Sequence, residues 1–577
     1  MRRIASRAVP IFLCCIPLTL AACAKRRAVG DGAVVATADT TVVSASGMPA
    51  PMVAPNEEGY ELPQPELNRE GYAAITENEF QDAVANPLST FAIDVDAASY
   101  ANVRRFLVGE GRMPPRDAVR IEELVNYFDY DYPDPSGDAP FSIVTEVAPA
   151  PWNPAHRLVH VGLQGRRMEV AALPPANLVF LVDVSGSMDE PNKLPLLKEA
   201  FGMLVDNLRP QDRVAIVAYA GAAGLVLPPT RGSEKERIRD AITTLQPGGS
   251  TNGAEGIRLA YQLARDAFVR GGNNRVVLAT DGDFNVGVSS DAELVQLIER
   301  ERGGGIFLTV LGFGTGNLQD AKMEQLADRG NGNYAYLDGI DEARKVLVGE
   351  MGGTLFTIAK DVKVQVEFNP AEVKAYRLIG YENRLLAAED FNDDRKDAGE
   401  LGAGHSVTAL YEVVPAGAPD DPARRVDPLR YQRTRARSRV QDAFDRLRYR
   451  VGVAIPRGEL LTVKLRYKAP DGDVSRLLAH PLRDRGASLA AASADFRFSA
   501  AVAEWGMLLR ESRFRGTASY AGVAQLARGA LADDRGGYRG EFLRLVEASQ
   551  RLASSGSGRG EEPVGDHEMG GDGVVDR

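Results

Sequence analysis

The chain has 577 residues, of which 44% are hydrophobic and 25% are charged. This is the composition of a globular protein with ample length for more than one domain. Its formal net charge of −11 gives no support to a nucleic-acid-binding role. The five histidines are scattered and form no H-E-x-x-H pair, so the common zinc-protease motif is absent.

The N-terminus has the features of an export signal. Three arginines precede a short apolar run at residues 9–20. The run ends in Leu20-Ala-Ala-Cys23, which resembles a bacterial lipobox. This resemblance implies cleavage before Cys23 and acylation of that cysteine. We therefore expect residues 1–22 to be a lipoprotein signal peptide, with an ordinary secretory signal as the alternative.

The expected lipid anchor also gives the expected location. Acylated Cys23 would attach the mature chain to a membrane of the bacterial cell envelope. Ala24 after it, rather than Asp, favours the outer membrane of a Gram-negative host, with the protein facing the periplasm or the cell surface. Residues 23–79 are rich in Ala, Val, Thr, Pro and Gly, and we expect them to form an acylated, disordered tether about 40 Å long.

Residues 80–165 are expected to form an N-terminal folded region. The apolar pattern predicts a strand at 89–96, followed by helices at 99–110 and 121–128. Two more strands are expected at 141–147 and 158–163.

The first of these strands ends in Asp94-Val-Asp96, which resembles the D-x-D motif of haloacid-dehalogenase phosphatases. The fifth position of the motif is Ala98, and no matching downstream Lys and acidic pair stands out. We favour a structural interpretation, in which the two aspartates end a strand and cap the helix that opens near Ser99.

Apolar runs and helical periods alternate through residues 172–352, which is typical of a parallel sheet with helices on both faces. The expected strands are 178–182, 214–219, 275–279, 306–311 and 334–337. The expected helices are 195–208, 234–245, 254–268, 291–301 and 321–329.

The pattern returns to strands in residues 360–485, at 362–368, 373–379, 407–414 and 461–467. These strands could pair with those of the N-terminal region, which would leave the α/β domain inserted in a β-sandwich. Residues 486–556 are expected to be helical, with a stripe of Phe496, Val502, Trp505 and Leu509 that favours packing over a docking surface. Residues 557–577, rich in Gly and acids, are expected to be disordered.

Five oxygen-bearing residues stand where a metal site would be expected. Asp183, Ser185 and Ser187 follow the first apolar strand of the α/β domain, and ligands bind at the carboxyl ends of strands in open α/β sheets. Thr251 and Asp281 lie at two further loops. Hard oxygen donors without His or Cys suit Mg²⁺, with Mn²⁺ or Ca²⁺ as alternatives. The competing interpretation is that Asp183 and Ser185 only cap the next helix.

This arrangement resembles the von Willebrand factor type A domain and its metal-ion-dependent adhesion site, which is built as D-x-S-x-S, then a Thr, then an Asp. The resemblance implies that Ser185 and Ser187 bind the metal directly and that Thr251 binds directly or through water. It implies that Asp183 and Asp281 contact the metal mostly through bound water. One coordination position would then remain for a carboxylate of a partner protein.

A second resemblance covers the flanking regions. The segments beginning Phe91-Ala-Ile-Asp, Arg120-Ile-Glu-Glu and Tyr381-Glu-Asn-Arg are similar to those of bacterial lipoproteins of the YfbK type, which carry a von Willebrand factor type A domain. The fold class expected is therefore α/β: a doubly wound, mostly parallel, Rossmann-like sheet, flanked by a β-rich module and a C-terminal helical segment.

These features predict a membrane-anchored, extracytoplasmic adhesion or scaffold protein that is not an enzyme. It would grip the carboxylate of a protein partner through the divalent cation. Two alternatives remain open: a phosphatase that uses Asp94, and a structural scaffold whose metal site engages no ligand.

Overall fold

The structure is a computed structural model that describes residues 69–93, 96–220, 223–249, 253–282, 291–350, 356–396, 398–418, 458–470, 472, 474–532, 534 and 536–556. Several sequence-based expectations lie outside these residues: the signal peptide, Cys23, the tether up to residue 68, Asp94, Thr251 and the C-terminal tail. The expected disorder of the last part of the tether, residues 69–79, is wrong, because the amides of Arg69 and Gly71 donate to the carbonyls of Gly316 and Leu318 at 2.7 and 2.9 Å. Within the described ranges, no helix combines the length and hydrophobicity needed to cross a bilayer.

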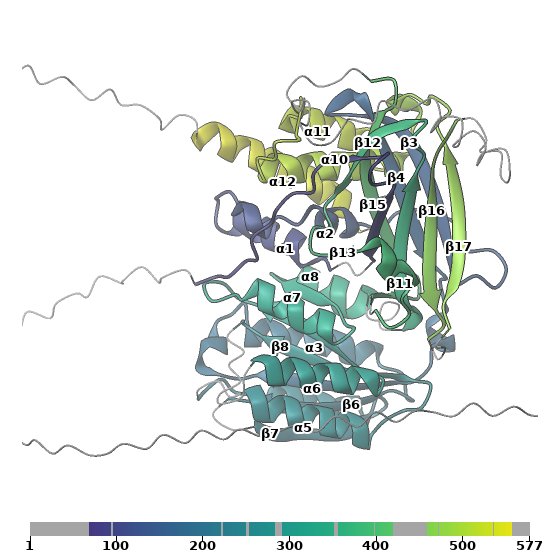
Figure 1. The fold of residues 1–577 in the computed structure, drawn as a ribbon. Coiled ribbons are helices and arrows are strands. Elements are labelled where there is room, and N and C mark those ends of the chain that lie inside the picture. Colours follow the sequence, from purple (N-terminus) through teal and green to yellow (C-terminus); the bar gives the residue numbers. More distant parts are fainter. Residues whose placement is uncertain are drawn as a thin grey trace, which may run out of the picture. The chain divides into compact units, whose positions relative to one another are not determined.

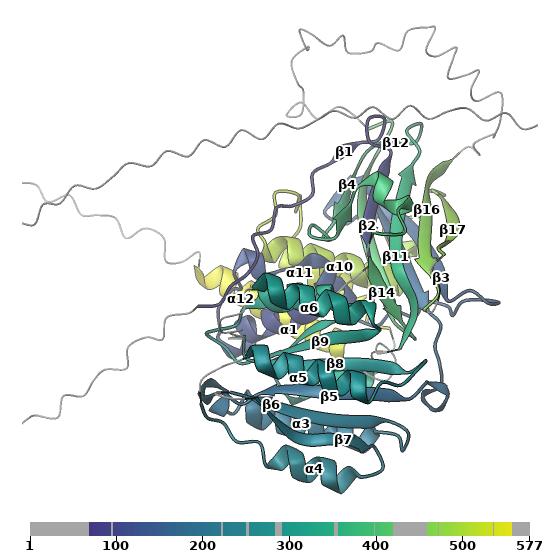
Figure 2. The ribbon, with the colours of Figure 1, turned by 60° about the horizontal axis from the view of Figure 1, so that its bottom comes forward.

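The central α/β domain is built on a sheet with the strand order β10-β9-β8-β5-β6-β7 (Figure 2). The strands are β5 (Ala176–Asp183), β6 (Arg213–Tyr219), β7 (Ala223–Arg231), β8 (Asn273–Thr280), β9 (Ile306–Phe313) and β10 (Tyr334–Leu337). All neighbours pair in parallel except β6 and β7, which are antiparallel. The expected doubly wound, mostly parallel sheet is confirmed. The edge strand β7 was not expected, because its exposed face weakens the apolar pattern.

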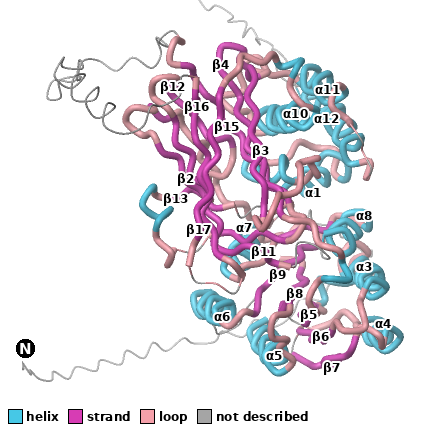
Figure 3. Tube along the Cα trace, turned by 90° about the vertical axis from the view of Figure 1, so that its right-hand side faces the viewer, coloured by secondary structure: helices cyan, strands magenta, loops and turns pink. Residues whose placement is uncertain are grey.

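Helices cover both faces of this sheet (Figure 3). They are α3 (Leu194–Asn207), α4 (Lys235–Thr243), α5 (Gly253–Asp266), α6 (Asp291–Gly303), α7 (Asp320–Arg329) and α8 (Ile340–Arg344), the last continued by a π-helical turn at Lys345–Glu350. One apolar core joins α3, α4 and α8 to the sheet, and the other joins α5, α6 and α7 to the opposite face. Except for the edge strand β7, the strands are buried on both faces, as expected of a parallel sheet covered by helices.

The chain enters and leaves this domain through a β-sandwich. One sheet has the order β1-β12-β15-β4-β3, from Gln81–Asp82, Val373–Ile379, Ser406–Pro415, Asn153–Gly165 and Phe141–Ala150. The other has the order β13-β2-β11-β16-β17, from Leu385–Leu386, Leu88–Ala92, Thr357–Phe368, Glu459–Lys468 and Arg476–Arg483, with β14 (Gly399–Gly402) paired to β11. Strands before and after the α/β domain pair directly, β4 with β15 and β2 with β11. The predicted insertion of the α/β domain in a β-sandwich is confirmed.

A helical layer covers the outer face of the β12-β15-β4-β3 sheet (Figure 1). It contains α1 (Ala98–Arg104), α2 (Ile121–Asn126), α10 (Ala494–Leu509), α11 (Tyr520–Arg528) and α12 (Tyr538–Gly556). Phe496, Val502, Trp505 and Leu509 are all buried in this layer, so the interpretation of the stripe as packing is confirmed. The first expected helix is shorter than predicted, because after Arg104 the chain continues as a π-helical turn, Arg105–Gly109.

The expected capping of this helix by Asp96 is wrong. The residue at the N-cap of α1 is Ala97, which makes no side-chain capping bond, and the amide of Ser99 donates to Glu123 Oε2 at 2.8 Å. Asp96 accepts from the amide of Tyr334 at 2.7 Å and from Arg384 at 3.4 Å. The buried carboxylate of Glu123, 24 residues further along the chain, therefore accepts the hydrogen bond that a local cap would accept.

Candidate metal centre

The two candidate aspartates lie at the carboxyl ends of adjacent strands. Asp183 is the last residue of β5, and Asp281 follows the last residue of β8. Because β5 and β8 pair in parallel, with Val182 opposite Ala279, their ends meet at the same edge of the sheet. Both carboxylates are fully buried, although each ends a strand where a loop begins. The fold thus gathers two negative charges at one edge.

Asp183 is held by three donors. Its Oδ1 accepts from the amide of Ser185 at 2.9 Å, and its Oδ2 accepts from the hydroxyls of Tyr219 and Thr280, both at 3.2 Å. Burial raises the pKa of Asp183 to about 6, against the opposing effect of the hydrogen bonds from Ser185. Asp183 is therefore fixed in place, and a nearby cation would favour its charged form.

The two serines are not used as helix caps. Ser185 precedes a single 3₁₀ turn, Gly186–Asp189, to which its side chain makes no capping bond. Its Oγ lies 3.1 Å from the Oγ of Ser187, which is exposed. The alternative that Asp183 and Ser185 only cap the next helix therefore loses its main support, and two hydroxyl oxygens stand side by side at the strand end.

The loop that leads to Thr251 is tied to this site. The amide of Gly248 donates to the carbonyl of Val184 at 2.7 Å, and the amide of Gly186 donates to the carbonyl of Gly249 at 3.2 Å. Gly249 has φ +86°, a backbone conformation that favours glycine. These bonds hold the loop against the serine turn up to residue 249; Thr251 itself lies outside the described residues.

Asp281 has one oxygen that the described protein does not satisfy. Its Oδ1 is buried and has no hydrogen-bond partner among the described residues. Its Oδ2 lies 3.3 Å from the ammonium of Lys193, which is 2% exposed. A buried carboxylate oxygen without a donor is costly, and a cation or water would remove that cost. The donor set, two carboxylates and two hydroxyls, fits Mg²⁺ better than zinc.

Lys193 is the functional neighbour that the sequence analysis missed. Its ammonium also donates to the carbonyl of Ser187 at 2.9 Å and to Glu190 at 3.1 Å. It stands directly before Leu194, the first residue of α3, where the helix dipole disfavours a positive charge. The unusual position of a lysine at the start of a predicted helix was thus the signal in the sequence that could have identified Lys193. In this position it supplies one positive charge to the metal site.

A second acidic cluster is an ion-pair network. Carboxylate oxygens of Asp96, Glu123 and Glu324 lie within 4.8 Å of one another, and all three residues are buried. Arg120 bonds Glu123, and Arg384 donates to Glu324 at 3.2 Å and to Asp96 at 3.4 Å. The acids of this cluster are thus already paired with the guanidiniums of Arg120 and Arg384. These ion pairs join α2, α7 and the sandwich. Both oxygens of Asp96 are engaged there, which gives no support to a phosphatase role for it.

Three family models match the chain. The model described as Uncharacterized protein YfbK, C-terminal, matches residues 353–552, that of von Willebrand factor matches residues 66–160, and that of the von Willebrand factor type A domain matches residues 178–283. The third match contains Asp183, Ser185, Ser187, Thr251 and Asp281.

The chain is also similar to individual proteins. The chain is 44% identical over 483 residues to the Uncharacterized protein YfbK of Escherichia coli, which covers 82% of this chain and 80% of that protein. It is 32% identical over 170 residues to the magnesium-chelatase 60 kDa subunit of Cereibacter sphaeroides, which covers 26% of this chain and 28% of that protein. A solved von Willebrand factor type A structure from Catenulispora acidiphila aligns over 82% of this chain and 91% of its own, with 14% identity and a TM-score of 0.37.

The similarity to the Escherichia coli protein extends over most of both chains and includes the α/β domain together with its flanking regions. The chain therefore belongs to the YfbK family and carries a von Willebrand factor type A domain.

Proposed function

We propose that this protein is a membrane-anchored, extracytoplasmic binding protein that engages a carboxylate of a partner protein through a divalent cation. The observation that carries the proposal is the convergence of Asp183, Ser185 and Asp281 at one edge of the sheet, where a buried oxygen of Asp281 has no hydrogen-bond partner among the described residues. Mg²⁺ is the preferred cation, with Mn²⁺ or Ca²⁺ as alternatives.

Each residue has a distinct part in this proposal. Ser185 and Ser187 would supply neutral hydroxyl oxygens, and Thr251 a third. Asp183 and Asp281 would supply the negative charge that retains the cation at the site. When bound, the cation would offer a Lewis-acidic position to a carboxylate oxygen. Ser187, which is exposed, marks the side from which a partner would approach.

The same residues support a non-enzymatic role. No histidine is among the hydrogen-bond partners of Ser185 or Ser187 in the described part of the chain, so neither serine has the usual base of a nucleophile. The phosphatase alternative depends on Asp94, which lies outside the described residues. A phosphate-release assay of the wild-type protein and Asp94→Asn tests it: equal, background-level activity would reject the phosphatase.

Partner binding should require the cation. Asp183→Ala should abolish capture of a partner from envelope extracts, and EDTA should do the same to the wild type, with recovery on adding Mg²⁺. Asp341→Ala, at an exposed acid of the same domain, is the matched control and should capture normally. Circular dichroism checks that both variants fold. Capture that persists undiminished in EDTA would contradict the proposal, and a site that binds Mg²⁺ but captures nothing would favour the scaffold alternative.

Membrane attachment is proposed to depend on Cys23. The basic leader, the apolar run and the Leu20-Ala-Ala-Cys23 sequence support this assignment. Stable anchoring needs more than one acyl chain, which a lipoprotein cysteine provides. Cys23→Ser should therefore give a soluble or unprocessed protein on fractionation. A normally processed variant that stays in the membrane fraction would show that the anchor lies elsewhere.

A further inference from the structure

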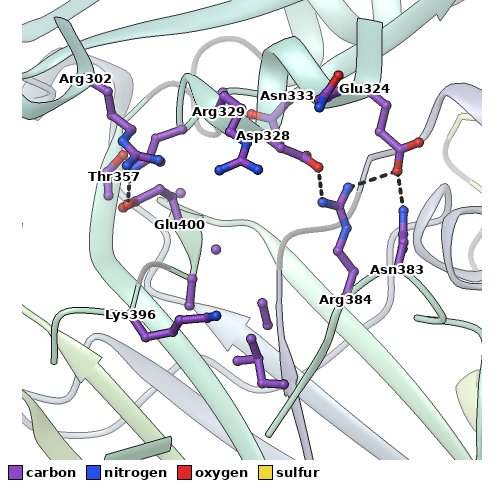
Figure 4. Close-up of a pocket in the computed structure, with 18 of the residues that line it drawn as sticks. Arg302, Glu324, Asp328, Arg329, Asn333, Thr357, Asn383, Arg384, Lys396 and Glu400 are labelled. Carbon is purple, nitrogen blue, oxygen red and sulfur yellow. Dashed lines mark hydrogen bonds and ion pairs between the residues drawn. The ribbon is translucent and has the colours of Figure 1, made fainter. Parts of the chain in front are cut away.

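A polar cavity of about 640 Å³ lies where the von Willebrand factor type A domain meets the sandwich (Figure 4). The α/β domain contributes the start of β8, the end of α6, helix α7 and the turn before β10. The sandwich contributes residues of β11, β13 and β14. The volume is in the range of sites for small molecules. The metal centre lies at the opposite end of β8, so the two sites are separate.

Positive charge predominates in the lining of this cavity. The basic lining residues are Arg275, Arg302, Arg329, Arg384 and Lys396, and the acidic ones are Glu324, Asp328 and Glu400. Arg384 is engaged by Glu324 and Asp328. Figure 4 shows Arg302, Arg329 and Lys396 around the same central space, reached from different elements. For a chain with a net charge of −11, this is a local reversal of sign.

Arg275 is the lining residue whose burial and unused hydrogen-bond donor favour a bound ligand. It is 2% exposed, and its Nη1 donates to Thr309 Oγ1 at 2.7 Å. Among the described residues, its buried Nε has no hydrogen-bond partner and its guanidinium has no ion pair. Burial lowers the pKa of Arg275 to about 10, and the charge of Glu400 opposes this shift. A buried guanidinium has five N–H donors and is costly to bury unless they are used.

We infer that this cavity binds a small polar molecule through an oxyanion group, a phosphate or a carboxylate. Arg275 would be the buried contact, and Arg329 and Lys396 would hold the same anion from the rim. A guanidinium suits such groups because its N–H donors match two oxygens at once. Amides of Asn331, Asn333 and Asn383 also line the cavity and would bind other polar groups of the ligand.

The experiment is calorimetric titration of the full chain, in EDTA and at constant ionic strength, with inorganic phosphate in one arm and succinate in the other. At least one anion should bind saturably, and the arm that binds tells phosphate from carboxylate recognition. Arg275→Met should raise Kd by about tenfold or more, because it removes charge-assisted hydrogen bonds. Arg237→Met, at an exposed arginine on α4, is the matched control and should leave Kd unchanged.

Lys396→Ala gives a second measurement, since Lys396 is 51% exposed and its replacement should leave the fold intact. It should raise Kd by about threefold, as expected for a more exposed charge. The inference is overturned if neither anion binds saturably, or if binding is unchanged in both cavity variants. Because the titration is done in EDTA, its outcome is independent of the metal centre, and either proposal can fail alone.

Discussion

At its carboxyl end strand β8 leads into Asp281, a buried carboxylate, whereas at its amino end it carries Arg275, a buried guanidinium. In the part of the chain that the structure describes, one oxygen of Asp281 and one nitrogen of Arg275 have no hydrogen-bond partner. Six residues of extended chain, about 20 Å, separate them. The first site is built inside one domain, because parallel strands end together and their loops converge. The second exists only because the sandwich closes over the sheet at that end. One strand thus leads at one end to the proposed cation site and at the other to the proposed anion site.

The difference between the two ends of β8 can be tested first by adding a divalent cation. A ligand that binds only the native state at a hundredfold excess over Kd stabilises it by about 2.7 kcal/mol. For a domain of this size the transition should rise by about 5–10 °C in scanning calorimetry with Mg²⁺, Mn²⁺ or Ca²⁺. Asp281→Ala should remove most of the shift, whereas Arg275→Met, at the other end of β8, should keep it. If all three cations leave every transition unmoved, the metal site is wrong.

The cavity at the amino end of β8 can be examined by measuring stability as a function of pH. Burial raises the pKa of Glu324 to about 7, with Glu123 and Asp328 adding to the rise and Arg120 opposing it. The native state therefore keeps a proton that the unfolded state releases, and stability falls as pH rises from about 4.5 to 7. Glu324→Gln should remove this loss, on the order of 2 kcal/mol at pH 8 and little at pH 4.5.

Guanidinium unfolding at pH 4.5 and pH 8 measures this effect. Glu236→Gln, at an exposed glutamate on α4, is the control and should follow the wild type. An identical dependence on pH in wild type and Glu324→Gln would show that Glu324 ionises as freely in the native protein as in the unfolded chain.

The smallest expected effect concerns Lys193, which places a positive charge beside the carboxylates at the carboxyl end of β8. Its ammonium contacts Asp281, so it repels an incoming cation while it compensates the carboxylates without one. Lys193→Met should strengthen Mn²⁺ binding by about tenfold, the equivalent of one pKa unit of charge interaction. It should also lower the melting temperature in EDTA, because a buried carboxylate loses its counter-charge.

Titration calorimetry with Mn²⁺ tests this, with Lys198→Met on the same helix as the control. Weaker binding of Mn²⁺ in Lys193→Met would mean that Lys193 orients Asp281 for the metal rather than competing with it.

Much of the metal centre could be predicted from the sequence because its residues are set by local pattern. The apolar run of β5 identifies a buried parallel strand; Asp183 is its last residue, and Ser185 and Ser187 follow within the next four residues. Asp281 follows β8 in the same way. The position of Lys193 could not be read from this pattern, because its contact with Asp281 spans 88 residues and depends on how α3 packs on the sheet.

The α/β domain, its helices and the strand ends where the oxygen donors lie could be predicted from local pattern, because hydrophobic periodicity and the parallel topology that it indicates place them. No such pattern shows that Glu123 rather than Asp96 accepts from the start of α1, or that Arg275 is buried beside a cavity. Within the sequence Arg275 is one basic residue at the start of a strand. The other charges that line this cavity come in part from α7 and from sandwich segments more than 80 residues away in the chain. Long-range packing, which no local pattern encodes, therefore created the second site.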